Sequence, residues 1–364
     1  MRELKVGVLG AAGTIAPAIL GDLAISAEVS SVVALDLNYE RARDAAASHG
    51  GDKTTAREAD ARAGLASELE GLDVLINTAS YRVNLDAMEA CLAAGCDYLD
   101  LGGLYWVTKS QLELADRFER AGRLALLGVG SSPGKTNLMA ARAIRELDSV
   151  DSIDVVAGGR DFNPPGGFSP PYAVQTLLDE VTLNPVVLRD GEAVEIEPLT
   201  SGGEVDFGEP IGRAQTIYTL HSELVSFGPS FGCRECSFRL SLAPAVEDKL
   251  RDLIGATPEE IAAAGATATS PSPETVSVHL IEARGSGRHV RVRSITRPYE
   301  PFGLGGSIVS TATPAVAAVR LLAHRKIDAI GVRFPEQCID PDEMFAELAT
   351  RSCEITVEVE ELAA

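Results

Sequence analysis

The chain has 364 residues, 45% of them hydrophobic, and a formal net charge of −21 from 53 acidic and 32 basic side chains. This length and this hydrophobic content suit two domains with buried cores. An acidic surface repels phosphate backbones and anionic lipid, so we expect no nucleic acid and no membrane among the partners. We find no run of about 18 apolar residues and no secretory signal pattern before the first apolar strand, and these observations predict a cytoplasmic protein.

Residues 5–20 combine a short apolar run, a glycine turn and the start of a helix pattern. Gly10 and Gly13 have no Cβ, which lets backbone N–H groups and a helix N-terminus approach a pyrophosphate. Ala16 is the small residue that close packing of helix on strand requires. Ala12 stands where the middle glycine of the common dinucleotide turn is usually found, so the turn is a variant. We expect the turn to bind a dinucleotide through Gly10, Ala12, Gly13, Thr14 and Ile15.

Asp36 closes the next apolar run, at residues 32–35. A carboxylate in this position can accept both ribose hydroxyls of NAD and repels the 2′-phosphate of NADP. Arg41 and Arg43 follow on the next predicted helix, where they either meet a 2′-phosphate or are simply solvated. We therefore expect NAD as the cofactor, with NADP as the second choice. Further cofactor contacts are expected on the loops that follow two of the strands, at Leu37, Asn38, Thr78, Ala79 and Ser80.

Strand and helix patterns alternate through the first 130 residues. The predicted strands are 5–9, 32–35, 73–77, 97–101 and 124–129, and the predicted helices are 14–25, 39–48, 63–70, 84–94 and 109–121. Repeated βα units of this kind predict an α/β fold with a doubly wound parallel sheet of the Rossmann type. In such a fold, ligands bind at the carboxyl ends of the strands.

After about residue 150 the pattern changes. Glycine and proline cluster at 158–171, too densely for a helix or an uninterrupted strand. Strand patterns at 186–197, 236–242, 276–284 and 289–296, with a helical pair in 245–265, predict an inserted antiparallel α+β domain. The βα pattern returns near 306–323, with a helix of small residues predicted from Thr313 to His324. We expect a Rossmann domain of residues 1–135 plus about 305–335, and a second domain of about 136–304 plus 336–364.

The six cysteines include the pair Cys233 and Cys236, whose spacing is found in redox and zinc sites. A structural zinc site needs a second pair or histidines, and neither lies nearby. We expect reduced thiols and no metal site.

The loop at residues 131–137 ends the fifth predicted strand and opens a helix. Its N–H groups and the Lys135 ammonium can bind a substrate carboxylate, with Thr136 and Asn137 beside them. A cation is unfavourable at the N-terminus of a helix, which favours a functional Lys135 over a solvated one. Asp100 follows a strand that ends at the same edge. It can hold a substrate ammonium, accept a proton or stabilise its own turn.

Three further side chains are candidates for the substrate pocket. Tyr105 either walls the pocket or packs against Trp106. Tyr172 can reach a substrate amine. His221 titrates near neutrality, which suits a general base for imine hydrolysis, and an ordinary hydrogen-bonded histidine is the alternative.

Several segments together resemble the saccharopine dehydrogenase-like family, most closely its L-lysine dehydrogenase and saccharopine reductase members. They are Gly10-Ala-Ala-Gly-Thr-Ile, Asp73-Val-Leu-Ile-Asn-Thr-Ala, Gly95-Cys-Asp-Tyr-Leu-Asp-Leu-Gly-Gly, Gly128-Val-Gly-Ser-Ser-Pro-Gly-Lys-Thr-Asn-Leu, His221-Ser-Glu-Leu and Gly331-Val-Arg-Phe-Pro-Glu. The resemblance implies a Rossmann domain, an inserted substrate and dimerisation domain, a homodimer, and hydride transfer at a carbon–nitrogen bond of an amino-acid substrate.

Two departures from the family pattern bear on the substrate. Asp36 stands where saccharopine reductases carry arginine, and the segment from Leu101 to Tyr105 differs from their acidic loop. Both favour an NAD-dependent enzyme for oxidative deamination of L-lysine or a related diamino acid. One alternative is an opine reductase of the saccharopine or carboxynorspermidine type, and another is a non-catalytic Rossmann protein that senses a nucleotide.

Overall fold

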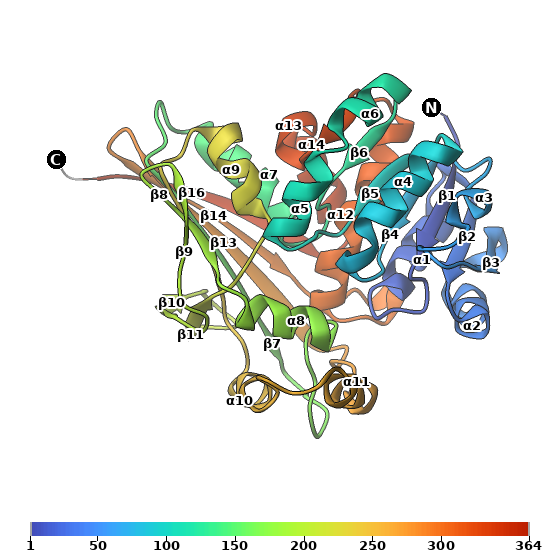
Figure 1. Ribbon diagram of the computed structural model, residues 1–364. Helices are drawn as coiled ribbons and strands as arrows, with labels where there is room; N and C mark the ends of the chain where they lie inside the picture. Colours follow the sequence, from blue (N-terminus) through green and yellow to red (C-terminus); the bar gives the residue numbers. More distant parts are fainter. Residues whose placement is uncertain (1, 363–364) are drawn as a thin grey trace. The chain divides into compact units, whose positions relative to one another are not determined.

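The computed structural model describes residues 2–362, which form two compact units. Unit 1 comprises Met1–Lys135 and Thr311–Leu348, and unit 2 comprises Thr136–Ser310 and Ala349–Ala364. The chain passes between the units at the start of helix α7 (Lys135–Ile144) and inside helix α12 (Gly306–Ala323). Figure 1 labels the elements.

Unit 1 is built on a seven-stranded parallel sheet in the order β15-β6-β5-β4-β1-β2-β3. Its strands are β1 (Leu4–Leu9), β2 (Val29–Asp36), β3 (Thr54–Glu58), β4 (Val74–Asn77), β5 (Asp97–Asp100), β6 (Leu124–Leu126) and β15 (Gly331–Arg333). Every residue of β4 and β6 is buried, as expected for a sheet covered on both faces. The predicted doubly wound sheet of the Rossmann type is therefore confirmed.

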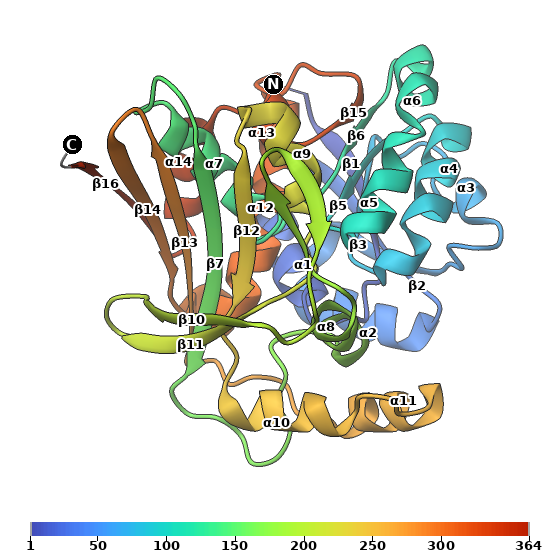
Figure 2. The same ribbon diagram turned by 60° about the vertical axis from the view of Figure 1, so that its left-hand side comes forward.

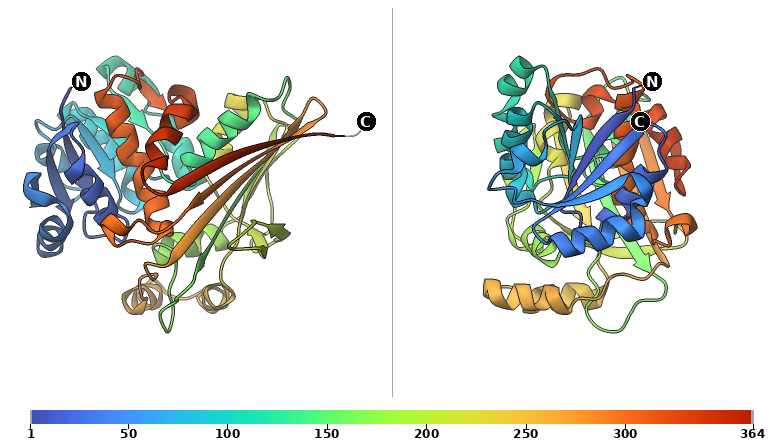
Figure 3. Two further views of the ribbon diagram at one scale, coloured as in Figure 1. Left: turned by 180° about the vertical axis from the view of Figure 1, so that it is seen from behind. Right: turned by 90° about the vertical axis from the view of Figure 1, so that its right-hand side faces the viewer.

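Helices cover both faces of this sheet. Figure 1 shows α4, α5 and α6 in front of it, and the view from behind in Figure 3 shows α12 and α14 on the other side. The predicted helix at 109–121 is in fact two helices, which meet at residues 113–114. Besides α12, the helices of unit 1 are α1 (Ala16–Ile25), α2 (Tyr39–His49), α3 (Leu65–Glu68), α4 (Asn84–Ala94), α5 (Tyr105–Leu112), α6 (Ala115–Ala121), α13 (Pro335–Cys338) and α14 (Pro341–Ala349). Two 3-10 turns, η1 (Gly51–Lys53) and η2 (Tyr81–Val83), complete the unit.

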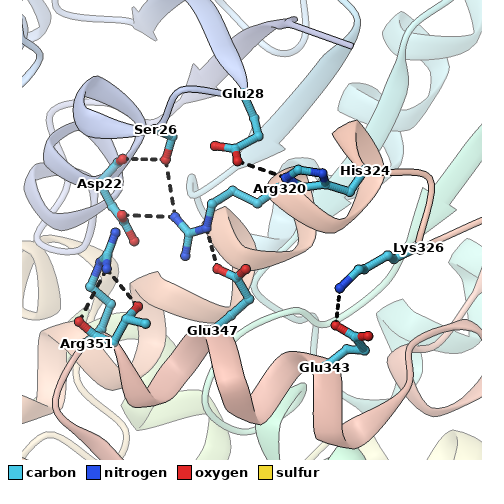
Figure 4. Close-up of polar contacts among 10 residues, drawn as sticks. Asp22, Ser26, Glu28, Arg320, His324, Lys326, Glu343, Glu347 and Arg351 are labelled. Carbon is cyan, nitrogen blue, oxygen red and sulfur yellow. Dashed lines mark hydrogen bonds and ion pairs between the residues drawn. The ribbon is translucent and has the colours of Figure 1, made fainter. Parts of the chain in front are cut away.

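Arg320 ties α12 to α1 and α14 (Figure 4). Its Nη1 donates to Asp22 Oδ1 at 3.0 Å and to Ser26 Oγ at 3.2 Å, and its Nε donates to Glu347 Oε2 at 2.6 Å. The Arg320 side chain is 8% exposed and that of Asp22 is fully buried. The ion pair between Arg320 and Glu347 attaches α14 to unit 1, which therefore continues to Leu348. The sequence analysis expected the C-terminal segment of this domain to end at about residue 335.

Unit 2 contains a nine-stranded sheet, in which β10-β11-β12-β7-β13-β14-β16 form the main path and β8, paired with β9, joins β12. The long strands β12, β7, β13 and β14 lie side by side in Figure 2. All pairs are antiparallel except β12 with β7, which are parallel, so the prediction of an antiparallel domain is correct except at this pair. The strands are β7 (Ser152–Asp161), β8 (Val186–Arg189), β9 (Glu192–Glu195), β10 (Ser201–Asp206), β11 (Arg213–Tyr218), β12 (Glu235–Leu240), β13 (Thr275–Gly285), β14 (Arg288–Thr296) and β16 (Cys353–Glu361).

The helices of unit 2 are α7, α8 (Val174–Thr182), α9 (Glu223–Phe231), α10 (Pro244–Asp252) and α11 (Pro258–Thr267), with the 3-10 turn η3 (Glu300–Phe302). The predicted helical pair corresponds to α10 and α11. Thr257 and Glu260 form a capping box at the start of α11, which satisfies backbone N–H groups that the first turn leaves free.

Strand β7 runs through Gly158 and Gly159, where the density of glycine and proline predicted no uninterrupted strand. That prediction was wrong for the start of the cluster, because Gly158 makes room for an aromatic ring. A Cβ on Gly158 would lie 2.6 Å from Cε1 of Phe207. Phe207 is fully buried in an apolar cluster with Val156 and Leu280. This glycine therefore serves packing on the sheet and does not break the strand.

Among the described residues, α12 is the one helix that is long and apolar enough to cross a membrane by length and composition. Of its 18-residue window, 83% is buried inside the protein, which is the pattern that a core helix also gives. A single helix of this kind is weak evidence for a membrane span.

Candidate functional site

The glycine turn lies at the point where the strand order of unit 1 reverses, between β1 and β4. Gly10 has φ +80°, and a Cβ there would lie 2.7 Å from the backbone nitrogen of Ala79. Thr78 fixes the second loop, because its Oγ1 donates to the Leu9 carbonyl at 2.8 Å. Ser80 follows, where its side chain caps η2. The two loops at the carboxyl ends of β1 and β4 are thus in direct contact, as the dinucleotide prediction requires.

The start of α1 fits a dinucleotide. No side chain caps its N-terminus at Ile15, and its first turn carries no acidic residue. Gly13 and Thr14, just before it, are exposed. The N–H groups of an uncapped first turn, together with the positive end of the helix dipole, are what a pyrophosphate binds.

Asp36 ends β2 and holds the glycine turn. Its Oδ2 accepts from the Ala12 N–H at 3.0 Å, and its Oδ1 accepts from the Asn38 N–H at 3.0 Å. A carboxylate has about four lone-pair sites, so both oxygens retain capacity for ribose hydroxyls. Arg41 donates to the Ala12 carbonyl at 2.9 Å, which places a cation beside this carboxylate. Leu37 is exposed next to it.

Asp100 lies at the end of β5 and is almost fully buried. Its two oxygens accept from five donors, at distances from 2.7 Å for Gln111 and Gly128 to 3.2 Å for Asn84. The five donors are Tyr98, Asn84, Gly102, Gln111 and Gly128. Burial raises the pKa of Asp100 although these hydrogen bonds act in the opposite direction. The contacts match a structural aspartate that organises the loops around it, which is one of the alternatives that the sequence left open.

Tyr105 is also buried, and its ring packs edge-to-face on Trp106 with centroids 4.8 Å apart. This is the packed aromatic pair that the sequence analysis named as the alternative to a pocket wall. Trp106 itself is 47% exposed.

Lys135 is fully buried at the first position of α7, so it is not a solvated surface lysine. Its backbone N–H donates to the Gly130 carbonyl at 2.9 Å. Gly134, with φ +121°, closes the turn before it. A fully buried lysine is rare unless it is paired, and Lys135 takes part in at least one further interaction.

Unit 2 brings together three of the predicted residues, from α7, from the segment before α8 and from the segment before α9. His221 Nδ1 lies 2.7 Å from Glu223 Oε2, and Thr136 donates to Glu223 Oε1 at 3.0 Å. On the other side of the ring, His221 Nε2 lies 3.9 Å from Glu180 Oε1. The hydroxyl of Tyr172 donates to Glu180 Oε2. We call these five residues, Thr136, Tyr172, Glu180, His221 and Glu223, the histidine cluster.

The cluster is rigidly supported. The His221 ring stacks on Phe238 of β12 with centroids 3.6 Å apart and 15° between planes. Asn137, the last predicted substrate residue, donates to Ser226 of α9 at 3.3 Å and is buried. Thr136 and Asn137 thus bind α9 and help to fix the helix that carries Glu223.

Burial opposes protonation of His221, but the charge and hydrogen bond of Glu223 and the charge of Glu180 outweigh it and raise its pKa. Burial raises the pKa of Glu180, and His221 and Tyr172 counteract it only in part. The pKa of Tyr172 is raised well above its usual range by burial and by Glu180. A carboxylate that orients an imidazole whose other nitrogen is open is the arrangement of a general base.

Glu180 and Glu223 were not predicted. Glu223 lies inside the quoted segment His221-Ser-Glu-Leu, so a search for a carboxylate that orients the histidine would have found it. Glu180 has no local signal, because it comes from another helix. Within residues 2–362 no three His, Cys, Asp or Glu side chains are placed to hold a metal ion, and all six cysteines are free thiols.

Comparison with known proteins bears on both units. The family model of the saccharopine dehydrogenase NADP-binding domain matches residues 6–126, inside unit 1. The fold is similar to that of saccharopine dehydrogenase (L-Glu forming) from Saccharomyces cerevisiae, with a TM-score of 0.71 and 14% identity. That match covers 98% of this chain and 100% of the yeast chain.

Two bacterial relatives match parts of the chain. A carboxyaminopropylagmatine dehydrogenase from Synechocystis is 32% identical over 166 residues, which are 43% of this chain and 40% of that protein. A carboxynorspermidine synthase from Vibrio cholerae is 25% identical over 245 residues, which are 60% of this chain and 58% of that protein. The chain thus spans about half the length of these relatives. Together these matches confirm the resemblance to the saccharopine dehydrogenase-like family, whose NADP-binding domain model matches residues 6–126.

Proposed function

We propose that the protein is an NAD-dependent oxidoreductase that acts on a carbon–nitrogen bond of an amino acid or of an amine joined to one. The observation that carries the proposal is the presence of two parts on one chain. One is a dinucleotide turn followed by Asp36, and the other is a buried histidine oriented by a carboxylate. A non-catalytic nucleotide sensor has no use for the second part.

The chemistry divides between cofactor and protein. A bound nicotinamide supplies or accepts the hydride at the carbon of the C–N bond. His221 takes the proton from the substrate nitrogen, and Glu223 stabilises the imidazolium that forms. In the hydrolytic direction the same imidazole takes a proton from the water that attacks the imine. Lys135 binds the substrate carboxylate. Asp36 selects NAD through the adenosine ribose, and Asn38, Thr78, Ala79 and the turn hold the rest of the dinucleotide.

Two substrate classes are compatible with this machinery. Free L-lysine or a related diamino acid gives oxidative deamination, which is the reading that Asp36 favours. An opine-type secondary amine is the second, and the names of the Synechocystis and Vibrio relatives favour it. We give the opine class precedence, because the names of the relatives bear on the substrate whereas Asp36 bears only on the cofactor. We further propose a cytoplasmic homodimer, since two-fold symmetric assembly is the commonest arrangement of oligomeric enzymes.

A substrate panel tests the proposal. NADH and NADPH formation at 340 nm is measured with free diamino acids, saccharopine and carboxynorspermidine, and the reverse reaction is measured with amines plus carbonyl compounds. Turnover of at least one C–N substrate with NAD supports the proposal, and the active substrate decides between the two classes. No turnover with any of them, together with tight nucleotide binding, would favour the sensor.

A further inference from the structure

A buried polar network lies at the carboxyl ends of two neighbouring strands of unit 1, β4 and β5. Its members are Asn77 at the end of β4, Asn84 at the start of α4, Tyr98 and Asp100 on β5, and Gln111 on α5. Each of these side chains belongs to a residue that is at most 2% exposed. Burial of polar groups is costly unless they find hydrogen-bond partners, so a region that served stability alone would be apolar.

The hydrogen bonds of the network run in one direction, from Ala79 to Asp100. Asn77 Oδ1 accepts from the Ala79 N–H at 3.0 Å, and Asn77 Nδ2 donates to Asn84 Oδ1 at 2.9 Å. Asn84 Nδ2 in turn donates to Asp100 Oδ2 at 3.2 Å. Because a backbone N–H can only donate and a carboxylate can only accept, the two ends fix the orientation of both amides. We call Asn77, Asn84 and Asp100 the amide relay.

The amide relay joins two loops at the carboxyl edge of the sheet. At one end, Ala79 belongs to the loop that contacts the glycine turn, where a Cβ on Gly10 would lie 2.7 Å from the Ala79 nitrogen. At the other end, Asp100 Oδ1 accepts from the Gly128 N–H at 2.7 Å, and the Asp100 carbonyl accepts from the Val129 N–H at 2.7 Å. The loop after β4 and the loop after β6 are therefore held in one arrangement through Asp100.

The position of the relay in the sheet shows which half of a dinucleotide it concerns. Asp36, the proposed ribose acceptor, ends β2 on one side of β1, whereas β4 and β5 lie on the other side of β1. A dinucleotide crosses the crevice at this reversal of strand order. With its adenosine half on the β2 side, its nicotinamide half falls on the side of β4 and β5.

We infer that Asn84 is a positioning residue, which acts through Asn77 to hold loop 78–80 in the conformation that receives the nicotinamide half of the cofactor. This inference rests on the proposed use of NAD. Asn84→Asp keeps the size of the side chain and an acceptor for Asn77, but it has no donor for Asp100 and brings a second carboxylate next to the first. The relay is then broken at its centre, and the nucleotide has to order the loop when it binds.

The test is calorimetric binding of NAD and of AMP to the full chain, without any turnover. NAD occupies both halves of the site, whereas AMP carries only the adenosine half. We expect Asn84→Asp to weaken NAD binding by about 10- to 100-fold, the cost of ordering a few loop residues, and to change AMP affinity by less than about two-fold. The matched control is Asp86→Asn on the same helix turn, where the side chain is 45% exposed. It should bind both ligands like the unmodified protein.

A second variant serves if Asn84→Asp does not fold, which circular dichroism reports. Asn84→Ser adds no charge, and its hydroxyl is too short to bridge Asn77 and Asp100. We expect the same selective loss of NAD affinity from it. With an active substrate from the panel, either variant should raise KM for NAD by a factor similar to its loss of affinity, with a smaller change in kcat.

The comparison of the two ligands separates positioning from general damage. Weaker NAD binding with unchanged AMP binding supports the inference. Unchanged NAD affinity in a folded variant, or an equal loss for AMP, would overturn it even if the enzyme is active. If no panel substrate turns over but the selective loss is observed, the proposed function fails while the positioning role stands. An unmodified protein that does not bind NAD would overturn both.

Discussion

Replacement of Glu223 by Gln changes one atom of the cluster and reverses its hydrogen bonding. The amide oxygen can still accept from Thr136, which lies 3.0 Å from the present Oε1. The amide nitrogen then faces His221 Nδ1 across 2.7 Å and can only donate, so the imidazole must move its proton to Nε2. The lone pair that takes the substrate proton is lost. We expect kcat to fall by about 10²- to 10⁴-fold, the usual contribution of a general base.

The assay is kcat and kcat/KM for the best panel substrate, with thermal unfolding followed by circular dichroism. Glu223→Asp keeps a charged acceptor and should retain more activity than the Gln variant. Histidine nitrogen shifts in NMR should report the proton on Nε2 in the Gln variant and on Nδ1 in the unmodified protein. A Gln variant that is folded, has the altered tautomer and still turns over at the normal rate would refute the role of His221 as the base.

Three further outcomes follow from the structure. The pKa of His221 is raised above its usual value near 6.5, so kcat/KM should rise with pH through a pKa above that value, and an acidic limb of the kcat/KM profile at or below 6.5 would contradict the assignment. The stability that the ion pairs of His221 contribute is present below the pKa of the unfolded state and is lost as pH rises through the pKa of the folded state, which urea unfolding at several pH values measures. Asp36→Ser should weaken NAD binding by about 1.5–3 kcal/mol and relax discrimination against NADP in a fluorescence titration, whereas tighter NADP binding by the unmodified protein would count against NAD selection. Arg320→Met should lower the free energy of unfolding by about 3–5 kcal/mol in urea, because it removes an ion pair of the fully buried Asp22 carboxylate, and a change below about 1 kcal/mol would show that the pair is not strongly coupled to folding.

The nucleotide half of the fold could be predicted because its signals are local. An apolar run, Gly10 at positive φ, a helix start and Asp36 follow one another within forty residues. The edge strand β3 was missed, because its residues are polar and partly exposed and so give no apolar run. Strand β16 was missed as well, although its alternation of Ile355, Val357 and Val359 with polar residues is a period-two signal that the sequence contained.

The histidine cluster could be predicted only in pieces. Tyr172, His221 and Thr136 each gave a reason to suspect function, but nothing local placed them together. Glu180 completes the cluster through the packing of α8 in unit 2, which depends on contacts between distant segments. For Asp100 the residue type and position at a strand end were right, while its five donors come from four separate parts of the chain. The sequence therefore indicated Asp100 as a candidate, but its hydrogen-bond donors could not be predicted, because they depend on contacts between distant segments.

The most direct test of the central claim is to follow the hydrogen atom itself. The best panel amine is prepared with deuterium on the carbon bonded to nitrogen, and the reduced cofactor is analysed by mass spectrometry. If the protein oxidises a C–N bond, the NADH formed carries one deuterium and the rate shows a primary isotope effect whenever hydride transfer limits it. NADH without deuterium, formed from a labelled amine that is consumed, would mean that the hydride comes from another bond and would contradict the account.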